Sequence, residues 1–102
     1  MNDTPQPRPP AGLSARSRSL WEKYAPAGES AGRLALLEEA LRALDQADCA
    51  RAIVDRDGLI LSGGKIPHLH PAVRVEHQAR AQFVKMWDHL GLLHHSGGEV
   101  VL

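Results

Sequence analysis

Hydrophobic positions recur at helical spacing in the first half of the chain, between residues that start or stop helices. Ser14 precedes residues 15–25, where Leu20, Trp21 and Tyr24 form one apolar face, so a short helix capped by Ser14 is expected. A longer helical pattern covers residues 29–57 and is expected to end at Gly58. Its leucines form one narrow stripe at spacings of three or four residues: Leu34, Leu37, Leu41 and Leu44.

The second half predicts a small β-hairpin followed by another long helix. Residues 59–61 and Ile66 flank a glycine-containing turn, which is typical of a hairpin. Pro71 suits the first position of a helix, with His70 as its N-cap, and this helix is expected to end at Gly91. Leu92 is expected to fold back on Trp87. The predicted apolar face of this helix comprises Val73, His77, Ala81, Val84 and Trp87, with Phe83 and Leu90 beside it.

These patterns predict a mainly α fold: a short N-terminal helix plus a long antiparallel helical hairpin with a small β-hairpin at its tip. Residues 1–12 contain four prolines and no apolar pattern, which indicates a disordered arm. Residues 13–92 form the expected helical domain, and residues 93–102 are expected to be a flexible tail. The last three residues of that tail are either a docking peptide for a partner or a disordered end.

Composition and charge restrict the function classes. The chain has 102 residues, 12 basic and 12 acidic side chains and one cysteine. Zero net charge argues against a protein that coats DNA uniformly. Basic residues are nevertheless concentrated near the N-terminus, where they either contact DNA or are solvated charges: Arg8, Arg16, Arg18 and Lys23. A polar start, a single Cys49 and the lack of an apolar run of about 20 residues predict a cytoplasmic protein without a membrane partner.

Three histidines lie within ten positions, His68, His70 and His77, beside Glu76. Zinc requires three or four converging ligands, but no spacing typical of a zinc site is present. A helix entry explains the same residues better, with His77 expected as a hydrogen-bonded core residue. Cys49 lies on an acidic stretch, which raises a thiol pKa and disfavours a nucleophile. We therefore expect no catalytic residue, metal or cofactor, and no enzyme activity.

The leucine stripe predicts association between copies. A helix over residues 29–57 would be about 43 Å long, which is long for one small chain to cover. Asp48 and Arg51 interrupt the stripe, either as a local pair or as a polar contact between subunits. The residues expected at the interface are Leu34, Leu37, Leu41, Leu44, Asp48, Arg51, Phe83 and Trp87.

Two segments together resemble the small subunit of phage terminase, in one of its compact families. They are "LALLEEALRALDQADCARAIVDRDGLIL" and "GGKIPHLHPAVRVEHQARAQFVKMWDHLGL". The resemblance covers roughly residues 13–92. The order and spacing of the motif residues carry it: Trp21, Asp45, Asp48, Arg51, Gly58, His70, Pro71, Ala72, Arg80, Trp87, Leu90, Gly91 and Leu92.

The resemblance implies a non-enzymatic DNA-packaging component in the cytoplasm of a bacterial host cell. Small terminase subunits form closed rings, recognise double-stranded viral DNA and regulate the large subunit, which carries the ATPase and nuclease activities. This chain is shorter than many of them and has no clear N-terminal helix-turn-helix. A gene-transfer-agent component with little DNA sequence preference is therefore one alternative. A dimeric helical regulator that binds no DNA, and a small histidine-site metalloenzyme, are the alternatives from other classes.

Overall fold

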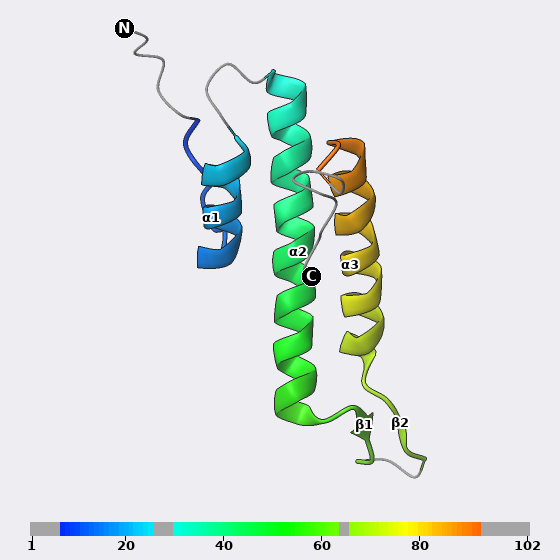
Figure 1. Ribbon diagram of the computed structural model, residues 1–102. Coiled ribbons are helices and arrows are strands. Elements are labelled where there is room, and N and C mark those ends of the chain that lie inside the picture. Colours follow the sequence, from blue (N-terminus) through cyan, green and yellow to red (C-terminus); the bar gives the residue numbers. More distant parts are fainter. Residues whose placement is uncertain (1–6, 26–29, 64–65, 93–102) are drawn as a thin grey trace, which may run out of the picture.

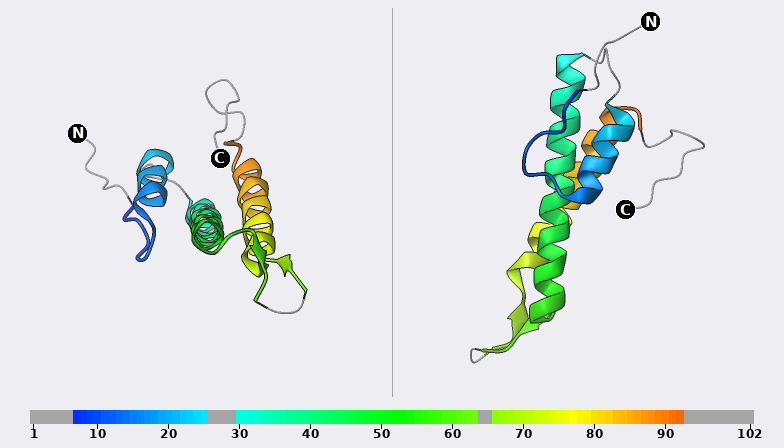
Figure 2. Two further views of the ribbon diagram at one scale, coloured as in Figure 1. Left: turned by 90° about the horizontal axis from the view of Figure 1, so that it is seen from below. Right: turned by 90° about the vertical axis from the view of Figure 1, so that its left-hand side faces the viewer.

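The computed structural model describes residues 7–25, 30–63 and 66–92. In chain order the elements are α1 (Ala15–Tyr24), α2 (Ala31–Asp57), β1 (Ile60–Leu61), β2 (His68–Leu69) and α3 (Pro71–His89). Helix α2 lies in the middle, with α1 and α3 along opposite sides of it and the two strands beyond its C-terminal end (Figure 1). Seen along α2, α1 and α3 flank it, and the C-terminal end of α3 (orange) lies toward the same side of α2 as α1 (Figure 2). The predicted helical hairpin with a β-hairpin at its tip is confirmed.

Each helix begins at a side chain that accepts a backbone N–H of the first turn. The Ser14 hydroxyl accepts from the Ser17 N–H at 3.1 Å, and the Ser30 hydroxyl accepts from the Arg33 N–H at 3.1 Å. The expected cap at Ser14 is thus confirmed. Ser30 is the N-cap of α2, which begins at Ala31, two residues later than the start at residue 29 that the sequence predicts. Such caps satisfy donors that have no partner inside the helix.

Glycines end the two long helices, as the sequence predicts. Gly58 has φ +92° and donates its N–H to the Val54 carbonyl at 2.7 Å, which closes α2. Gly91 has φ +78° and follows the last turn of α3. Side chains with a Cβ are disfavoured at such φ values, so these two positions favour glycine. Leu92 then turns back, and its N–H donates to the Trp87 carbonyl at 3.1 Å, as expected.

The two strands pair antiparallel, with Ile60 opposite Leu69 and Leu61 opposite His68. The returning strand is thus His68–Leu69, two residues later than Ile66, which the sequence placed there. The His70 N–H also donates to the Leu59 carbonyl at 2.8 Å, and this bond extends the pairing to the start of α3.

The core lies between all three helices. Leu41 and Leu44 of α2 are completely buried, and Trp87 of α3 contacts Tyr24 of α1 edge-on with ring centroids 5.3 Å apart. The main core consists of Leu13, Trp21, Ala25, Leu37, Ala40, Leu41, Ala43, Leu44, Phe83, Trp87 and Leu90. A second, smaller cluster nearer the strands contains Ala50, Val54 and Ala72. In this smaller cluster Ala50 of α2 and Ala72 of α3 are both small, which allows the two backbones to approach closely.

Helix α3 buries a face rotated from the one that the sequence predicts. His77 and Ala81 are exposed, so their expected place in the core is wrong. The buried residues of α3 are Ala72, Ala79, Phe83 and Trp87. Phe83, expected beside the apolar face, is instead buried next to Trp87, with ring centroids 5.0 Å apart, while Val73 and Val84 are only partly buried.

Part of the expected disordered arm is held against the helices. The Pro7 carbonyl accepts from the indole N–H of Trp21 at 2.9 Å, and the Ala11 carbonyl accepts from Arg42 at 3.3 Å. Leu13 then enters the main core. The disordered-arm prediction is therefore wrong for residues 7–12, while residues 1–6 and the predicted tail, 93–102, lie outside the described residues.

Candidate nucleic-acid and subunit interfaces

Asp45 of α2 accepts hydrogen bonds from the polar groups at the start of α1. Its carboxylate accepts from the Ser14 N–H at 2.8 Å, from the Ser14 hydroxyl at 2.6 Å and from the Ser17 hydroxyl at 2.6 Å. Ser17 is fully buried, and its hydroxyl oxygen also lies 3.3 Å from the Leu41 carbonyl, a second acceptor for the same proton. The carboxylate therefore fixes the N-terminal end of α1 on α2, in addition to the apolar packing.

The hydrogen bonds to Asp45 favour its charged form. Burial raises the pKa of this carboxyl group, but the bonds from Ser14 and Ser17, helped by the positive charge of Arg42, outweigh burial and lower the pKa overall. Asp45 is thus ionised at neutral pH and accepts all of its hydrogen bonds in that form.

A chain of ion pairs joins the three helices next to this cluster. Asp48 lies 3.2 Å from Arg16 of α1 and 3.4 Å from Arg80 of α3. Arg80 also pairs with Glu76 at 2.9 Å, and Glu76 lies 3.7 Å from Arg51 of α2. The structure thus gives Asp48 and Arg51 separate partners within the chain, where the sequence suggested a local pair or a contact to another subunit.

The four predicted DNA-contacting residues are exposed but differ in their surroundings. Arg16 is paired with Asp48, which partly neutralises its charge. Arg18 donates to the Leu13 carbonyl at 3.4 Å, and the Lys23 ammonium lies 5.3 Å from the centre of the Tyr24 ring. Arg8 follows the Pro7 carbonyl that is bound to Trp21, which places it near α1.

Helical geometry divides these cations between two sides of α1. Arg16 and Lys23 are seven residues apart and share one side. Arg18 lies on the other side together with Glu22, four residues on, which offsets its charge. The candidate nucleic-acid interface is therefore a thin basic rim around α1.

Most of the predicted subunit interface is already buried inside one chain. Leu37, Leu41, Leu44, Phe83 and Trp87 are each 5% exposed or less, because α1 and α3 cover the leucine stripe from two sides. The expectation that these side chains need a second copy to cover them is wrong. Leu34 is half-buried against the same core.

The most exposed large apolar side chains of the described residues lie instead at the strands. Leu59, Ile60 and Leu69 are about half exposed, and Ile66 is 76% exposed. We call these four residues the tip surface. Clustered aliphatic side chains on the surface of a protein commonly mark an interaction site. Within the described ranges, no helix has an apolar stretch long enough to cross a bilayer.

The histidines have separate roles in the structure. His70 is the N-cap of α3: its Nδ1 accepts from the Ala72 N–H at 3.0 Å, as predicted, and its Nε2 lies 3.1 Å from Asp57. With Nδ1 accepting, Nε2 carries the proton and donates to the Asp57 carboxylate. His68 and His77 are exposed. Among the described residues, no three His, Cys, Asp or Glu side chains are grouped so that they could hold a metal ion.

The pair of bonds made by His70 joins the ends of α2 and α3. Asp57 is kept ionised because the Arg56 side chain donates to it, and the bond from His70 lowers its pKa further. The base of the tip is therefore held by a polar chain that runs from Arg56 through Asp57 to His70 and the first turn of α3.

Replacing His70 by alanine is expected to lower the free energy of unfolding by about 1 kcal/mol, the usual value for removal of an N-cap. His70→Asn should lower it much less, because the asparagine side-chain oxygen can accept the same Ala72 N–H. Urea unfolding followed by circular dichroism measures both variants. Equal losses in the two variants would show that capping is not the contribution of this side chain.

Comparisons of the chain with protein-family models, with curated proteins and with solved structures found no match.

Proposed function

We propose that this chain is the small subunit of a phage-type DNA-packaging terminase. Copies assemble into a ring that holds double-stranded DNA and presents the large ATPase and nuclease subunit to it. The chain itself contributes scaffolding and regulation, without a catalytic step.

The exposed tip surface is the observation that carries this proposal. The core is closed by three helices, yet four large aliphatic side chains are exposed around the strands, with Ile60 and Leu69 directly opposite each other in the pairing. Such a surface is costly in water and is expected to be covered by another protein surface. A scaffolding role requires surfaces of this kind.

The positions of the motif residues support the resemblance on which the proposal draws. Gly58 and Gly91 end the long helices, and His70 with Pro71 begins α3. Asp48 contacts the other two helices. A protein that shares these residues in this order is expected to share the helical hairpin.

The basic rim of α1 supports DNA binding by an assembly. One copy offers few cations, so a single contact with DNA would be weak. A ring repeats the rim in each copy, and contacts made at the same time strengthen binding without any new contact.

The expected result is a single species of many copies in native mass spectrometry, with salt-dependent binding of duplex DNA in fluorescence anisotropy. Replacing Arg8, Arg18 and Lys23 together by glutamine should weaken binding and reduce the slope of log affinity against log salt by about 1 for each DNA phosphate that the variant no longer binds. Arg74→Gln is the matched control, because Arg74 is exposed on α3, away from α1.

A monomer, or an assembly that does not bind DNA, would contradict the proposal. A two-chain species indifferent to salt and nucleic acid would favour a helical regulator of another protein. An equal loss of DNA binding in Arg74→Gln would show that the rim of α1 is not the contact.

A further inference from the structure

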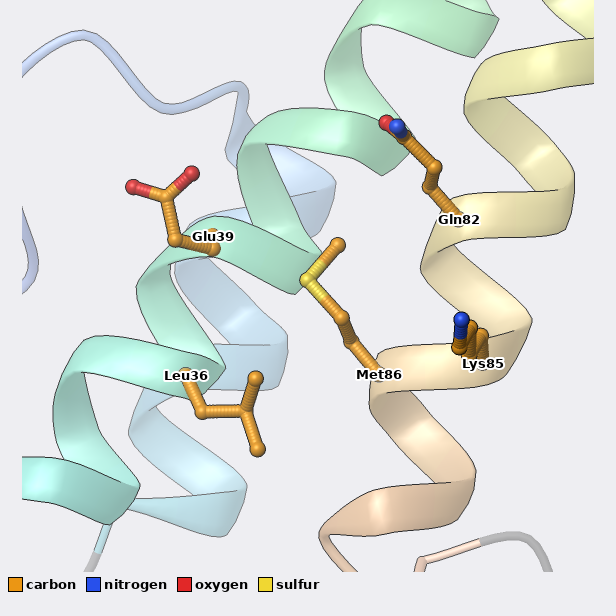
Figure 3. Close-up of a pocket in the computed structure, with 5 residues that line it drawn as sticks. All are labelled: Leu36, Glu39, Gln82, Lys85 and Met86. Carbon is orange, nitrogen blue, oxygen red and sulfur yellow. The ribbon is translucent and has the colours of Figure 1, made fainter.

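A second partly apolar surface lies at the other end of the helical hairpin. A groove of about 390 Å³ between α2 and α3 is lined by Leu36, Glu39, Gln82, Lys85 and Met86 (Figure 3). Leu36 extends from α2 toward α3, and Met86 extends from α3 toward α2, so these two side chains form its apolar floor (Figure 3). Both are half-buried against the main core. A methionine in the floor allows the groove to adapt to an inserted side chain.

The charges around the two surfaces are complementary. Glu39 and Lys85, both exposed, give the groove one acidic and one basic group. Next to the tip surface, Arg56 and Asp57 form a pair 2.7 Å apart, and Arg56 remains 72% exposed. An approaching tip can therefore place the exposed guanidinium of Arg56 near Glu39 of the groove.

One molecule cannot bring its own tip into its own groove. Leu36 and Asp57 are 21 positions apart on the continuous helix α2, which corresponds to roughly 30 Å. The rigid helix α2 thus holds the groove and the tip surface of one molecule apart. A tip that fills the groove must therefore come from a second copy.

The small area of the tip surface also favours tip-to-groove contacts that repeat from copy to copy over a dimer in which two tips contact each other. Four partly exposed aliphatic residues amount to a few hundred Å², which is below the roughly 800 Å² per partner of a stable interface. If the tip of each copy contacts the groove of the next, every copy in a ring buries both surfaces. A contact between two different surfaces continues from copy to copy and closes into a ring when the rotation allows it.

We infer that the tip surface of one copy docks into the α2–α3 groove of the next, with Ile66 as the most exposed inserting side chain. The inference rests on the proposed assembly into a ring and names the contact that builds it.

Two charge-introducing variants test the contact in native mass spectrometry. Ile66→Glu changes the tip, and Gln82→Arg places a long charged side chain at the groove; both residues are exposed, so folding should be retained. Each variant alone should need at least about ten times more protein to assemble than the unchanged chain. Gln78→Glu, exposed on α3 but outside both surfaces, is the matched control and should assemble normally.

An equimolar mixture of the two variants gives the most specific result. The Ile66→Glu chain retains an intact groove, and the Gln82→Arg chain retains an intact tip, so the mixture should form a two-chain species that neither variant forms alone. Normal assembly of Gln82→Arg alone would mean that tips contact tips, and would overturn the inference. Normal assembly of both variants would overturn it as well, while the ring itself would stand. A monomeric unchanged chain would overturn the inference and the ring together.

Discussion

Replacing Trp87 by alanine is expected to lower the free energy of unfolding by about 3–5 kcal/mol, the usual range for a buried aromatic residue. Trp87 is 5% exposed and contacts the rings of Tyr24 and Phe83, so its removal separates α3 from α1 as well as leaving a cavity. Small domains are stable by only about 5–15 kcal/mol, so a large fraction of the total is lost. Urea unfolding followed by far-ultraviolet circular dichroism measures the change.

The control for Trp87 is Gln78→Ala, whose side chain is exposed on α3 outside both proposed contact surfaces and whose loss should change stability by less than about 0.5 kcal/mol. Because Trp87 is buried within a single chain, the loss in Trp87→Ala should be the same at low and high protein concentration. If Trp87→Ala lowers the free energy of unfolding only at concentrations where copies associate, Trp87 instead lies at a subunit interface, as the sequence predicted.

Asp45→Asn is expected to lower the free energy of unfolding by about 1–3 kcal/mol at neutral pH, the range for buried polar groups left without partners. Three donors from Ser14 and Ser17 point at the carboxylate. Asparagine offers one acceptor oxygen, and its NH₂ group would face these donors. Ser17, which is fully buried, would then be left with the longer contact of its hydroxyl to the Leu41 carbonyl at 3.3 Å.

The effect of Asp45→Asn should also depend on pH. The pKa of Asp45 is lower in the folded chain than its ordinary value, since burial, which raises it, is outweighed by the hydrogen bonds from Ser14 and Ser17. Its contribution to stability is therefore present above the ordinary pKa of an aspartate and is lost as the pH falls through the folded pKa.

Unfolding measured from pH 7 down to pH 3 should consequently show the two proteins converging in acid. Asp55→Asn is the matched control, because Asp55 is exposed and pairs with Arg51 at the surface of α2. A difference between Asp45→Asn and the unchanged chain that stays constant over this range would contradict the proposed role of the charge.

The helix ends were predictable because local chemistry determines them. Ser14, Gly58, Pro71 and Gly91 act through the backbone of their own neighbours, so their roles do not depend on the remainder of the fold. His70 was predicted as a cap for the same reason, although its bond to Asp57 joins residues that only the folded hairpin brings together.

The buried face of α3 was harder to predict, because this helix has two faces of similar hydrophobicity. One contains Val73 and Val84, and the other contains Phe83 and Leu90, with Trp87 between them. Which face is buried depends on the volume available against α2, and single-residue hydrophobicity does not encode that volume.

The surroundings of the candidate DNA-contacting residues depend on contacts over long sequence distances. Arg16 meets Asp48 across 32 positions, and Asp45 meets Ser14 across 31. No local pattern indicates which cation finds an internal partner. Asp45 and Asp48 are acidic residues directly beside the leucine stripe. They were the available signal in the sequence that the capped end of another helix packs against α2 at this point.

The antiparallel arrangement of α2 and α3 also has a consequence for how the chain folds. Val54 and Ala72, which share the small cluster near the strands, close a loop of fewer than twenty residues, whereas Leu37 and Leu90 close one of more than fifty. Short loops cost less conformational entropy to close, and local contacts speed folding. Pairing of α2 with α3 is therefore expected to start at the strands and proceed turn by turn toward Trp87, with α1 docking last.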